Sequence, residues 1–574
     1  MHRAFTFISF ILPFFSSSQN LDKIGEEGMI TVSGGVNSNM VINQTVNQTQ
    51  FRDPFSWVLS GNITVNILDV SLPFTFSFSN TAKSYTQPFN MTAVHPTYKK
   101  WKAHLGITSM NFSSYTYQGI NFTGAGLEYS PKKWKIKGFG GRLKKAIEYD
   151  ASANNINSVS YSRMGFGLGT EYKGKKWGIE LLLLKAYDDA TSLKFYSNNP
   201  ELTAQDNIVA SLKGNISLLK SLRFNAEIAT SIITKNILAN DPSDQRKLYQ
   251  SLVQGNQTTE TNNAYNASLD YRYKFFGIGV KYERIDPGYK TLGAVYFNND
   301  LENITVNPSF TLFKNKVNLA LSTGYQRNNL DALNASDSKR WIGTVSLTAQ
   351  VVKGFSLSAN YSNMSSFSRK NPTADPFFTT IGDTLNFYQT SENTSASLSY
   401  SFGKVNKQAL SLTGSYSKST NITGRLEDAA AFGFNAGGAN DAPVDVYNGV
   451  FSHNLQLKKS GLVIGWMLNG NHTIALGATN TFFGPGLNAS KKLLKEKVSL
   501  TLGSNYNQQY TQSILTNHVL NLRIGARYSP TFLDKKYGSL SVSLNGNWNN
   551  KLAVINIPNE QNITIIVNLA YQFK

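Results

Sequence analysis

ITIIVNLAYQFK, residues 563–574, alternates between apolar and polar side chains. Every second residue from Ile563 to Phe573 is apolar, and most of the residues between them are polar. Successive side chains of a β-strand point to opposite faces, so the segment predicts a strand with one apolar and one polar face. Something must cover the apolar face, and a lipid bilayer is one such cover.

The same alternation recurs along the chain. It is clear in FGIGVKYER (276–284), LNLRIGARY (520–528) and LSVSLNGNW (540–548), and such segments repeat from about Ser56 to the C-terminus. Each is roughly ten residues long, the length that a tilted strand needs to cross a bilayer. No polar linker divides the chain into domains. The sequence predicts an all-β fold: a single transmembrane antiparallel up-and-down β-barrel.

Connections between the segments are of two kinds, as in outer-membrane barrels with short periplasmic turns and long extracellular loops. The short basic ones are 130–135, 173–178, 313–318, 351–356, 458–463, 490–499 and 533–539, and the long polar ones are 188–206, 235–261, 287–301, 366–384 and 419–445. Aromatic residues gather near the short turns, as an interfacial girdle does. A soluble β-sandwich also alternates, but these collective features favour the membrane barrel.

Composition narrows the choice further. Charged residues make up 16% of the 574 residues, and no apolar run reaches the roughly 18 residues of a transmembrane helix. The net charge of +20, from 55 Lys and Arg against 35 Asp and Glu, first suggests a polyanion such as nucleic acid. Export opposes that interpretation, and much of the excess falls in the short turns. No nucleic-acid partner is predicted.

The N-terminus predicts secretion. MHRAFTFISFILPFFSSSQN places a basic start before an apolar stretch and then small residues, which is the order of a signal peptide cleaved after Ser18. The alternative is a buried N-terminal strand or helix. The absence of cysteine fits an exported chain that no disulfide holds. We therefore divide the chain into a signal peptide (1–18), an N-terminal segment that is either a first strand or a lumen insert (19–55), and the barrel (56–574).

Two features resemble known outer-membrane proteins. The final strand, which ends with Phe573 before Lys574, resembles the C-terminal signal read by the barrel-assembly machinery and implies Gram-negative export. RDPFSWVLSGNITVNILDVSLPFTFSFSN (52–80), YTQPFN (85–90), HPTYKKWKAHLG (95–106) and MNFSSYTYQG (110–119) resemble large Bacteroidota-type outer-membrane β-barrels. That second resemblance covers about residues 50–145 and implies a fold and the outer membrane as location, but no reaction.

The expected number of strands implies a wide lumen that something must fill. About 21 strands follow Gly119, and three or four more candidates lie between Met29 and Phe112, so an even total of 22 or 24 is expected. Barrels of this size enclose a lumen that normally holds a plug. TonB-dependent transporters fill theirs with an N-terminal plug domain, whereas the strand pattern of this chain is expected to begin within a few tens of residues of the mature N-terminus. Inward-folded loops, the 19–55 and 80–100 segments, or a plugging or lipoprotein partner are the candidates for filling the lumen.

The alternation also predicts which charged side chains face the lumen. They are Lys135, Lys137, Glu171, Arg223, Glu227, Asp270, Arg272, Lys281, Glu283, Arg523 and Arg527. One interpretation is a hydrated lumen that selects a solute or binds a plugging element. The other is that opposite charges only satisfy each other in a polar interior, as is usual for such barrels.

The sequence predicts no catalytic, metal or cofactor site. The histidines show no catalytic spacing, and outer-membrane enzymes use much smaller barrels. The glycine runs GFGLG (165–169) and GAG (124–126) do not join a strand to a helix, so we interpret them as small residues where the backbone is closely approached. Asp441 and Asp445 lie in a loop without the regular spacing of a calcium site.

Two functions fit this sequence. The first is a transport-class, porin-like barrel that passes a solute or polymer through a lumen gated by its own loops or by a partner. The second is a non-enzymatic subunit or scaffold of an outer-membrane secretion or assembly complex. Both place the chain in the bacterial outer membrane, in contact with lipid and lipopolysaccharide.

Overall fold

A computed structural model of the chain describes residues 30–47, 53–80, 90–148, 159–193, 202–239, 252–294, 299–328, 330–331, 339–350, 352–363, 365–367, 388–421, 444–475, 477–530, 538–554 and 559–573. Within these ranges no helix is long and apolar enough to cross a bilayer. The predicted signal peptide, Asp441 and Lys574 lie outside the described residues.

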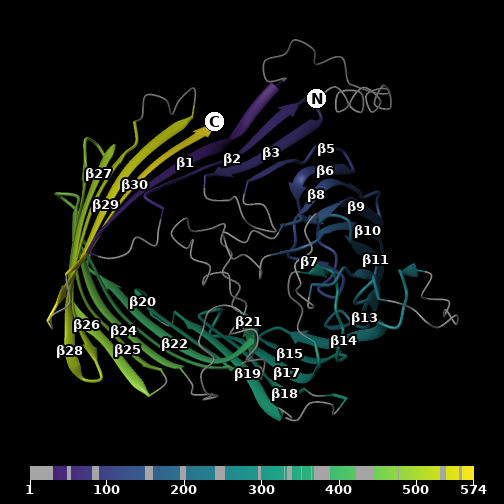
Figure 1. Cartoon of the computed structure of the whole chain (residues 1–574). Helices are drawn as coiled ribbons and strands as arrows, with labels where there is room; N and C mark the ends of the chain where they lie inside the picture. Colours follow the sequence, from purple (N-terminus) through teal and green to yellow (C-terminus); the bar gives the residue numbers. More distant parts are fainter. Residues whose placement is uncertain are drawn as a thin grey trace.

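The described strands form a closed antiparallel barrel of 26 strands (Figure 1). Strands that are neighbours in sequence pair with each other, which is the up-and-down order that the sequence predicts. In lipid every backbone N–H and C=O must be paired within the protein, and a closed sheet achieves this because it has no edge. The fold class is therefore confirmed.

The strand bounds follow the chain. The first half contains β1 (Ile30–Val46), β2 (Phe55–Ile67), β3 (Val70–Ser79), β4 (Met91–Val94), β5 (Thr97–Tyr98), β6 (Trp101–Thr108), β7 (Tyr117–Gln118), β8 (Phe122–Tyr129), β9 (Trp134–Lys144), β10 (Ser162–Lys173), β11 (Trp177–Asp189), β12 (Asp206–Ser217), β13 (Leu222–Thr234), β14 (Thr259–Tyr273) and β15 (Phe276–Ile285). The second half contains β16 (Gly293–Ala294), β17 (Leu301–Leu312), β18 (Val317–Arg327), β19 (Lys339–Ala349), β20 (Phe355–Ser362), β21 (Ser365–Phe367), β22 (Tyr388–Phe402), β23 (Lys407–Asn421), β24 (Val444–Leu457), β25 (Leu462–Ala475), β26 (Ala478–Leu493), β27 (Val498–Thr511), β28 (Ile514–Tyr528), β29 (Ser539–Ala553) and β30 (Glu560–Phe573).

The barrel closes where β30 meets β1. The two strands pair from Gly34 opposite Phe573 to Val46 opposite Gln561, and β1 also pairs with β2. Gly34 has φ +115, and a Cβ there would lie 2.0 Å from the carbonyl oxygen of Asn62. Only glycine fits this close approach. The first wall strand therefore lies inside the 19–55 segment, and it provides the partner that the last strand of the chain needs.

The predicted total of 22 to 24 strands is too low. Before Gly119 the wall contains β1, β2, β3, β6 and one strand in two pieces, β4 and β5, while the other 21 strands lie between Phe122 and Phe573 as predicted. Pro96 interrupts the two-piece strand because proline has no N–H to donate. The pairing continues around it, since the His95 N–H donates to the carbonyl of Pro73 over 2.8 Å.

The outer face is apolar around the barrel. Ile524, Leu487 and Leu502 are 63, 63 and 58% exposed in the isolated chain, although leucine and isoleucine are usually buried. An apolar surface that continues from strand to strand is a membrane-contact surface. The apolar face that the sequence leaves without a protein partner is therefore the outer face of the barrel.

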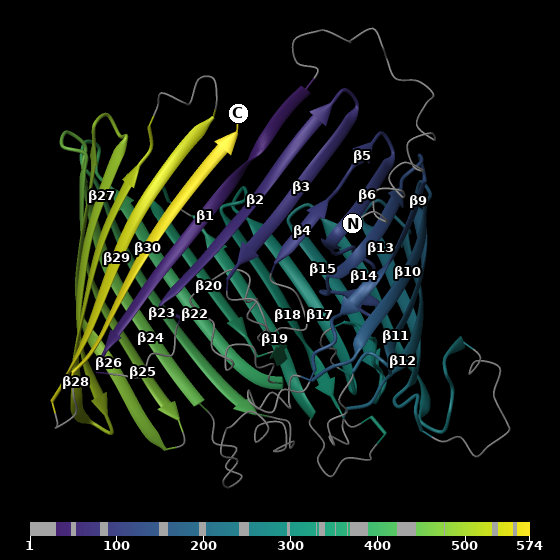
Figure 2. The ribbon, with the colours of Figure 1, turned by 45° about the horizontal axis from the view of Figure 1, so that its top comes forward.

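Most of the short turns lie at one rim, together with the start of β1 and the end of β30; this is the upper rim in Figure 2. The tight connections from β25 to β26 and from β27 to β28 lie at the opposite rim, and most of each long loop predicted there lies outside the described residues. Aromatic side chains gather near the upper rim: Trp101 stacks on Tyr129 with centroids 4.1 Å apart, and Tyr172 contacts Trp134 at 4.9 Å and Trp177 at 5.1 Å. Such rings mark a membrane interface, so the apolar belt lies between this rim and the long loops.

The register predicts opposite outcomes for two adjacent substitutions near the middle of β28. Leu522→Arg places a charge on the lipid face and is expected to cost roughly 2–4 kcal/mol of folding free energy. Asn521→Arg places the same charge in the lumen and is expected to cost far less. Urea titration of each variant refolded into lipid vesicles measures the difference. Equal costs would show that the faces are assigned wrongly.

Candidate functional site

The inner face of the barrel has two walls of different chemistry. Residues directly opposite each other in an antiparallel pair share a face, so the inward position can be followed from strand to strand. From β8 to β17 the inner face carries many charged side chains, and we call it the charged wall. From β24 through β30 to β2 it carries mainly Asn, Ser, Thr and Gly, and we call it the amide wall.

Two connections fold inward against the charged wall. Residues 109–121 join β6 to β8, and residues 286–294 follow β15; together we call them the interior block. Tyr117 pairs with Gly293 in a short parallel ladder between β7 and β16. Figure 1 shows β7 inside the ring of strands. Two loops that are far apart in sequence thus form one structure within the lumen.

Apolar packing holds the interior block on the wall. One cluster joins block residues to inward residues of β8, β9, β11, β12 and β13, and a second does the same from β13 to β17. The block contributes Met110, Tyr115, Tyr117, Ile120, Tyr289 and Leu292, and all six are at most 5% exposed. Burial of this kind stabilises the docked loops by the hydrophobic effect.

Small residues on the wall make room for this packing. A Cβ at Gly167 would lie 2.3 Å from the ring of Phe139, and one at Gly126 would lie 2.4 Å from the sulfur of Met110. Both positions belong to the glycine runs of the sequence. The close approach expected at these glycines is therefore present.

Lys137 anchors the 109–121 loop. Its ammonium donates to the carbonyl of Asn111 over 2.8 Å and to the carboxylate of Glu180 over 2.8 Å, and it lies 4.8 Å from the centre of the Phe112 ring. The Lys137 side chain is only 8% exposed. A buried ammonium needs such partners because burial without them is costly.

Glu283 anchors the same loop from β15. Its carboxylate accepts a 2.7 Å hydrogen bond from the Tyr115 hydroxyl, and the Tyr289 hydroxyl donates to the Tyr115 carbonyl over 2.8 Å. Both tyrosines belong to the block and not to the membrane-spanning strands. Burial raises the pKa of each, and the Glu283 carboxylate raises that of Tyr115 further, so both hydroxyls remain donors at neutral pH.

Asn207 on β12 anchors the second loop. Its amide nitrogen donates to Ser231 over 2.8 Å, and its oxygen accepts from the Leu292 N–H over 3.0 Å. Ser231 in turn donates to the carbonyl of Lys290 over 2.6 Å. Asn207 is fully buried, and a buried amide is stable only when its donors and acceptors are paired.

Every charged residue predicted for the lumen lies at an inner-face position of the register. These are Lys135, Lys137, Glu171, Arg223, Glu227, Asp270, Arg272, Lys281, Glu283, Arg523 and Arg527. On the charged wall many of them are brought together with an opposite charge or with the block. The ion pairs are Lys135–Glu128 at 2.8 Å, Lys137–Glu180 at 2.8 Å, Lys173–Glu171 at 3.2 Å and Lys281–Glu283 at 3.1 Å.

The remaining predicted residues of the charged wall lie next to neutral or oppositely charged side chains. Glu227 is 5% exposed and accepts a 2.8 Å hydrogen bond from Ser211. Arg223 lies directly opposite Asp270, whose carboxylate accepts from Asn225 over 3.2 Å, and Arg272 lies opposite a glycine of β15. Most of the predicted charged residues on this wall therefore lie near an opposite charge or hold the interior block in place.

Arg523 and Arg527 on β28 are in a different environment. Arg523 donates through Nε to Asn547 over 3.0 Å, and Arg527 donates through Nε to Ser541 over 2.9 Å. Neither takes part in an ion pair within the described part of the chain. Both side chains are exposed to the lumen.

The structure also joins residues that sequence reasoning missed. Nδ1 of His95 lies 3.1 Å from Nδ1 of His104, whose Nε2 lies 3.0 Å from Glu128. Glu128 also forms an ion pair with Lys135, so the four side chains are connected. The residues come from separate strands, so no local spacing signals them. The described residues contain no group of three or more His, Cys, Asp or Glu arranged to hold a metal ion.

Side-chain amides bond between strands of the amide wall. Examples are Asn471 to Asn448 at 2.6 Å, Asn469 to Asn507 at 3.0 Å, Asn517 to Gln509 at 3.0 Å, Gln509 to Asn480 at 3.3 Å, and Asn549 to Asn521. Each amide has two donors and two acceptor positions, so bonds within the wall leave capacity for a ligand. Asn62, Asn488 and Asn549 are exposed.

No family model and no curated protein sequence matches the chain. Among solved structures it is similar to the P pilus usher (PapC) translocation pore, with 11% identity, coverage of 94% of this chain and 99% of that chain, and a TM-score of 0.37. The FrpB iron transporter from Neisseria meningitidis has 11% identity, 96 and 82% coverage and a TM-score of 0.36. The copper transporter OprC has 9% identity, 94 and 80% coverage and a TM-score of 0.37. At these values the similarities say nothing about function.

Glycine substitutions test the packing of the interior block. A Cβ at Gly293 would lie 2.4 Å from the Thr116 carbonyl and 2.4 Å from Leu184, so Gly293→Ala is expected to destabilise docking by about 1–3 kcal/mol. Chymotrypsin is then expected to cleave after Tyr115 and Tyr117, which are buried in the parent protein. Peptide mapping by mass spectrometry measures this cleavage.

Gly546→Ala is the matched control, because nothing lies within 4 Å of a Cβ at that position. It is expected to leave both tyrosines protected. Equal protection in the Gly293→Ala variant would contradict the docked arrangement of the block.

Proposed function

We propose that the chain is a transport-class barrel of the bacterial outer membrane that passes a hydrophilic solute or polymer through its lumen. The observation that carries this proposal is the asymmetry of the inner face: a docked block covers part of the charged wall, whereas the amide wall presents exposed polar side chains. Multiple weak polar contacts along a wall suit passage because each one is easily exchanged for the next.

The interior block serves, in this proposal, as a constriction. A barrel of 26 strands encloses a wide lumen, and an unrestricted opening of that width would leak. The block is anchored by buried polar bonds, such as those of Lys137 and Asn207, and by apolar contacts. It therefore narrows the lumen from one side and leaves the path to run beside the amide wall, and a plugging or lipoprotein partner can complete the closure.

The proposal also covers the origin of the chain, its export and its contacts in the membrane. A Gram-negative, Bacteroidota-type bacterium exports the chain through its signal peptide, and the barrel-assembly machinery inserts it by way of its last strand. Lipid and lipopolysaccharide contact the apolar outer face. The protein is not an enzyme, needs no cofactor and binds no nucleic acid.

Conductance in planar bilayers tests the proposal. The purified protein is expected to form steady channels, and replacing residues 110–120 with a Gly-Ser linker of equal length is expected to increase the conductance, because the linker cannot dock on the charged wall. Exclusion of neutral polyethylene glycols of increasing size measures the width in both proteins.

Silence of both proteins in the bilayer would contradict transport through this barrel. Stoichiometric co-purification of other proteins under mild detergent would then favour a scaffold in a secretion or assembly complex. Steady channels of identical size in both proteins would retain transport but remove the constriction.

A further inference from the structure

Resting on the proposed function, we infer that the amide wall binds an acidic, hydroxyl-rich oligosaccharide, whose acidic groups contact Arg523 and Arg527 and whose hydroxyl groups contact the neighbouring amides.

Within the described ranges neither arginine has a carboxylate partner, in contrast to Lys137 and Lys281 of the charged wall. Arg523 lies opposite Gly503 and Asn547, and Arg527 lies opposite Ser499 and Ser543, so the directly opposed inner-face residues are all neutral. Each arginine donates through Nε to one neighbour, and within the described ranges its remaining N–H groups have no carboxylate acceptor. Such a fork fits a carboxylate, phosphate or sulfate group.

The arginines are spaced along the path. They lie on the same face four residues apart, which is about 13 Å along a strand. Arg527 is next to the end of β28 at the short-turn rim, and Arg523 lies deeper. A chain with acidic groups at intervals can therefore contact Arg527 first and Arg523 next.

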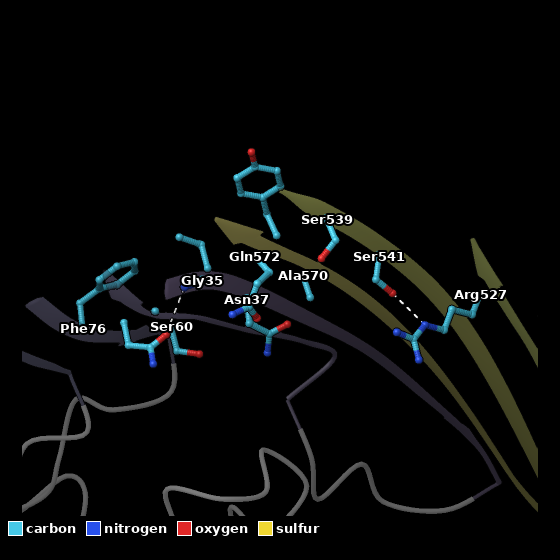
Figure 3. A pocket seen from close by; sticks show the side chains of 13 residues that line it. Gly35, Asn37, Ser60, Phe76, Arg527, Ser539, Ser541, Ala570 and Gln572 are labelled. Atoms are coloured by element: carbon cyan, nitrogen blue, oxygen red, sulfur yellow. Dashed lines mark hydrogen bonds between the residues drawn. The ribbon is translucent and has the colours of Figure 1, made fainter. Parts of the chain in front are cut away.

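Arg527 lines one side of a groove at the barrel closure. The groove has a volume of about 490 Å³ and is bounded by residues of β28, β29, β30, β1, β2 and β3. Figure 3 shows Arg527 reaching Ser541, with Asn37 and Gln572 on the adjoining strands. Apart from Arg527 every lining residue is uncharged, and most of the inward ones carry hydroxyl or amide groups.

The chemistry of the wall favours a glycan over a peptide or a nucleic acid. Amides donate to and accept from sugar hydroxyls, whereas a peptide would need apolar pockets and a nucleic acid would need many cations and aromatic stacking surfaces. Lys492 and Lys551 of this wall are paired with Glu496 and Glu560, so the two arginines are separate points of attraction, and such a wall releases an anion more easily than a continuous basic row does.

Basic residues at the same rim add long-range attraction. The short turns carry Lys99, Lys100, Lys132, Lys133, Lys175, Lys176, Lys274, Lys314, Lys404, Lys458, Lys459, Lys495 and Lys497. A positive rim raises the local concentration of an anionic ligand and speeds its association.

Binding to the full chain in detergent micelles tests the inference without any transport. The probes are a galacturonate hexamer and a maltose-series hexamer of equal length, measured by isothermal titration calorimetry. The acidic probe is expected to bind about tenfold more tightly, as two charge-assisted contacts allow, and added salt is expected to reduce the difference. R523Q/R527Q is expected to abolish the preference.

Arg223→Gln is the matched control, because it removes an inward arginine from the charged wall. It is expected to keep the preference for the acidic probe, and heat-modifiable migration in gels verifies that every variant is folded. Equal binding of both probes, no binding of either, or an equal loss in the control would overturn the inference. Tighter binding of a hexaglutamate peptide than of the galacturonate hexamer would overturn the glycan assignment.

The outcomes are separable from those of the conductance experiment. Channels without preference for the acidic probe would leave the proposed function standing and remove this inference. Binding that depends on both arginines in a protein without channels would retain the site and remove transport.

Discussion

The pairing of β1 with β30 is the constraint on which the rest of the structure depends. In hydrocarbon an unpaired strand edge would leave a row of donors and acceptors without partners, at a cost of several kcal/mol for each group. The ladder from Gly34–Phe573 to Val46–Gln561 removes that edge. Closure also fixes the alternation of every strand between lipid and lumen, because a slip of one residue would turn each apolar side chain inward.

The charged side chains that face the lumen need partners or solvent, and the two walls of the barrel differ in how they meet this need. On the charged wall, Lys137 and Glu283 are paired with opposite charges and also hold the 109–121 loop through Asn111 and Tyr115. On the amide wall most inward side chains are neutral, and the few charged ones include the Lys551–Glu560 ion pair and the two arginines of β28. The same polar interior thus supports a docked block on one side and an exposed polar surface on the other.

The sequence predicts the fold and the faces well because the alternation is local. Ile524 and Arg523 lie on the faces that their positions in LNLRIGARY predict. It undercounts strands where local signals fail: β1 has polar residues on both faces, and Pro96 splits a strand into pieces too short to stand out. Neither segment shows ten residues of regular apolar and polar alternation. Both nevertheless pair with their neighbouring strands, because the barrel could not close without them.

The interior block was beyond prediction for a physical reason. Tyr117 and Gly293 pair across a long sequence separation, and nothing near either residue identifies the other. One local signal existed, since MNFSSYTYQGI (110–120) is too rich in aromatic residues for a solvated loop. Those rings pack against the apolar part of the charged wall, which includes Phe139 and Leu184. An aromatic loop between two strands of a wide barrel therefore indicates a loop that folds into the lumen, because lipid, water and the strand ladder offer it no other apolar surface.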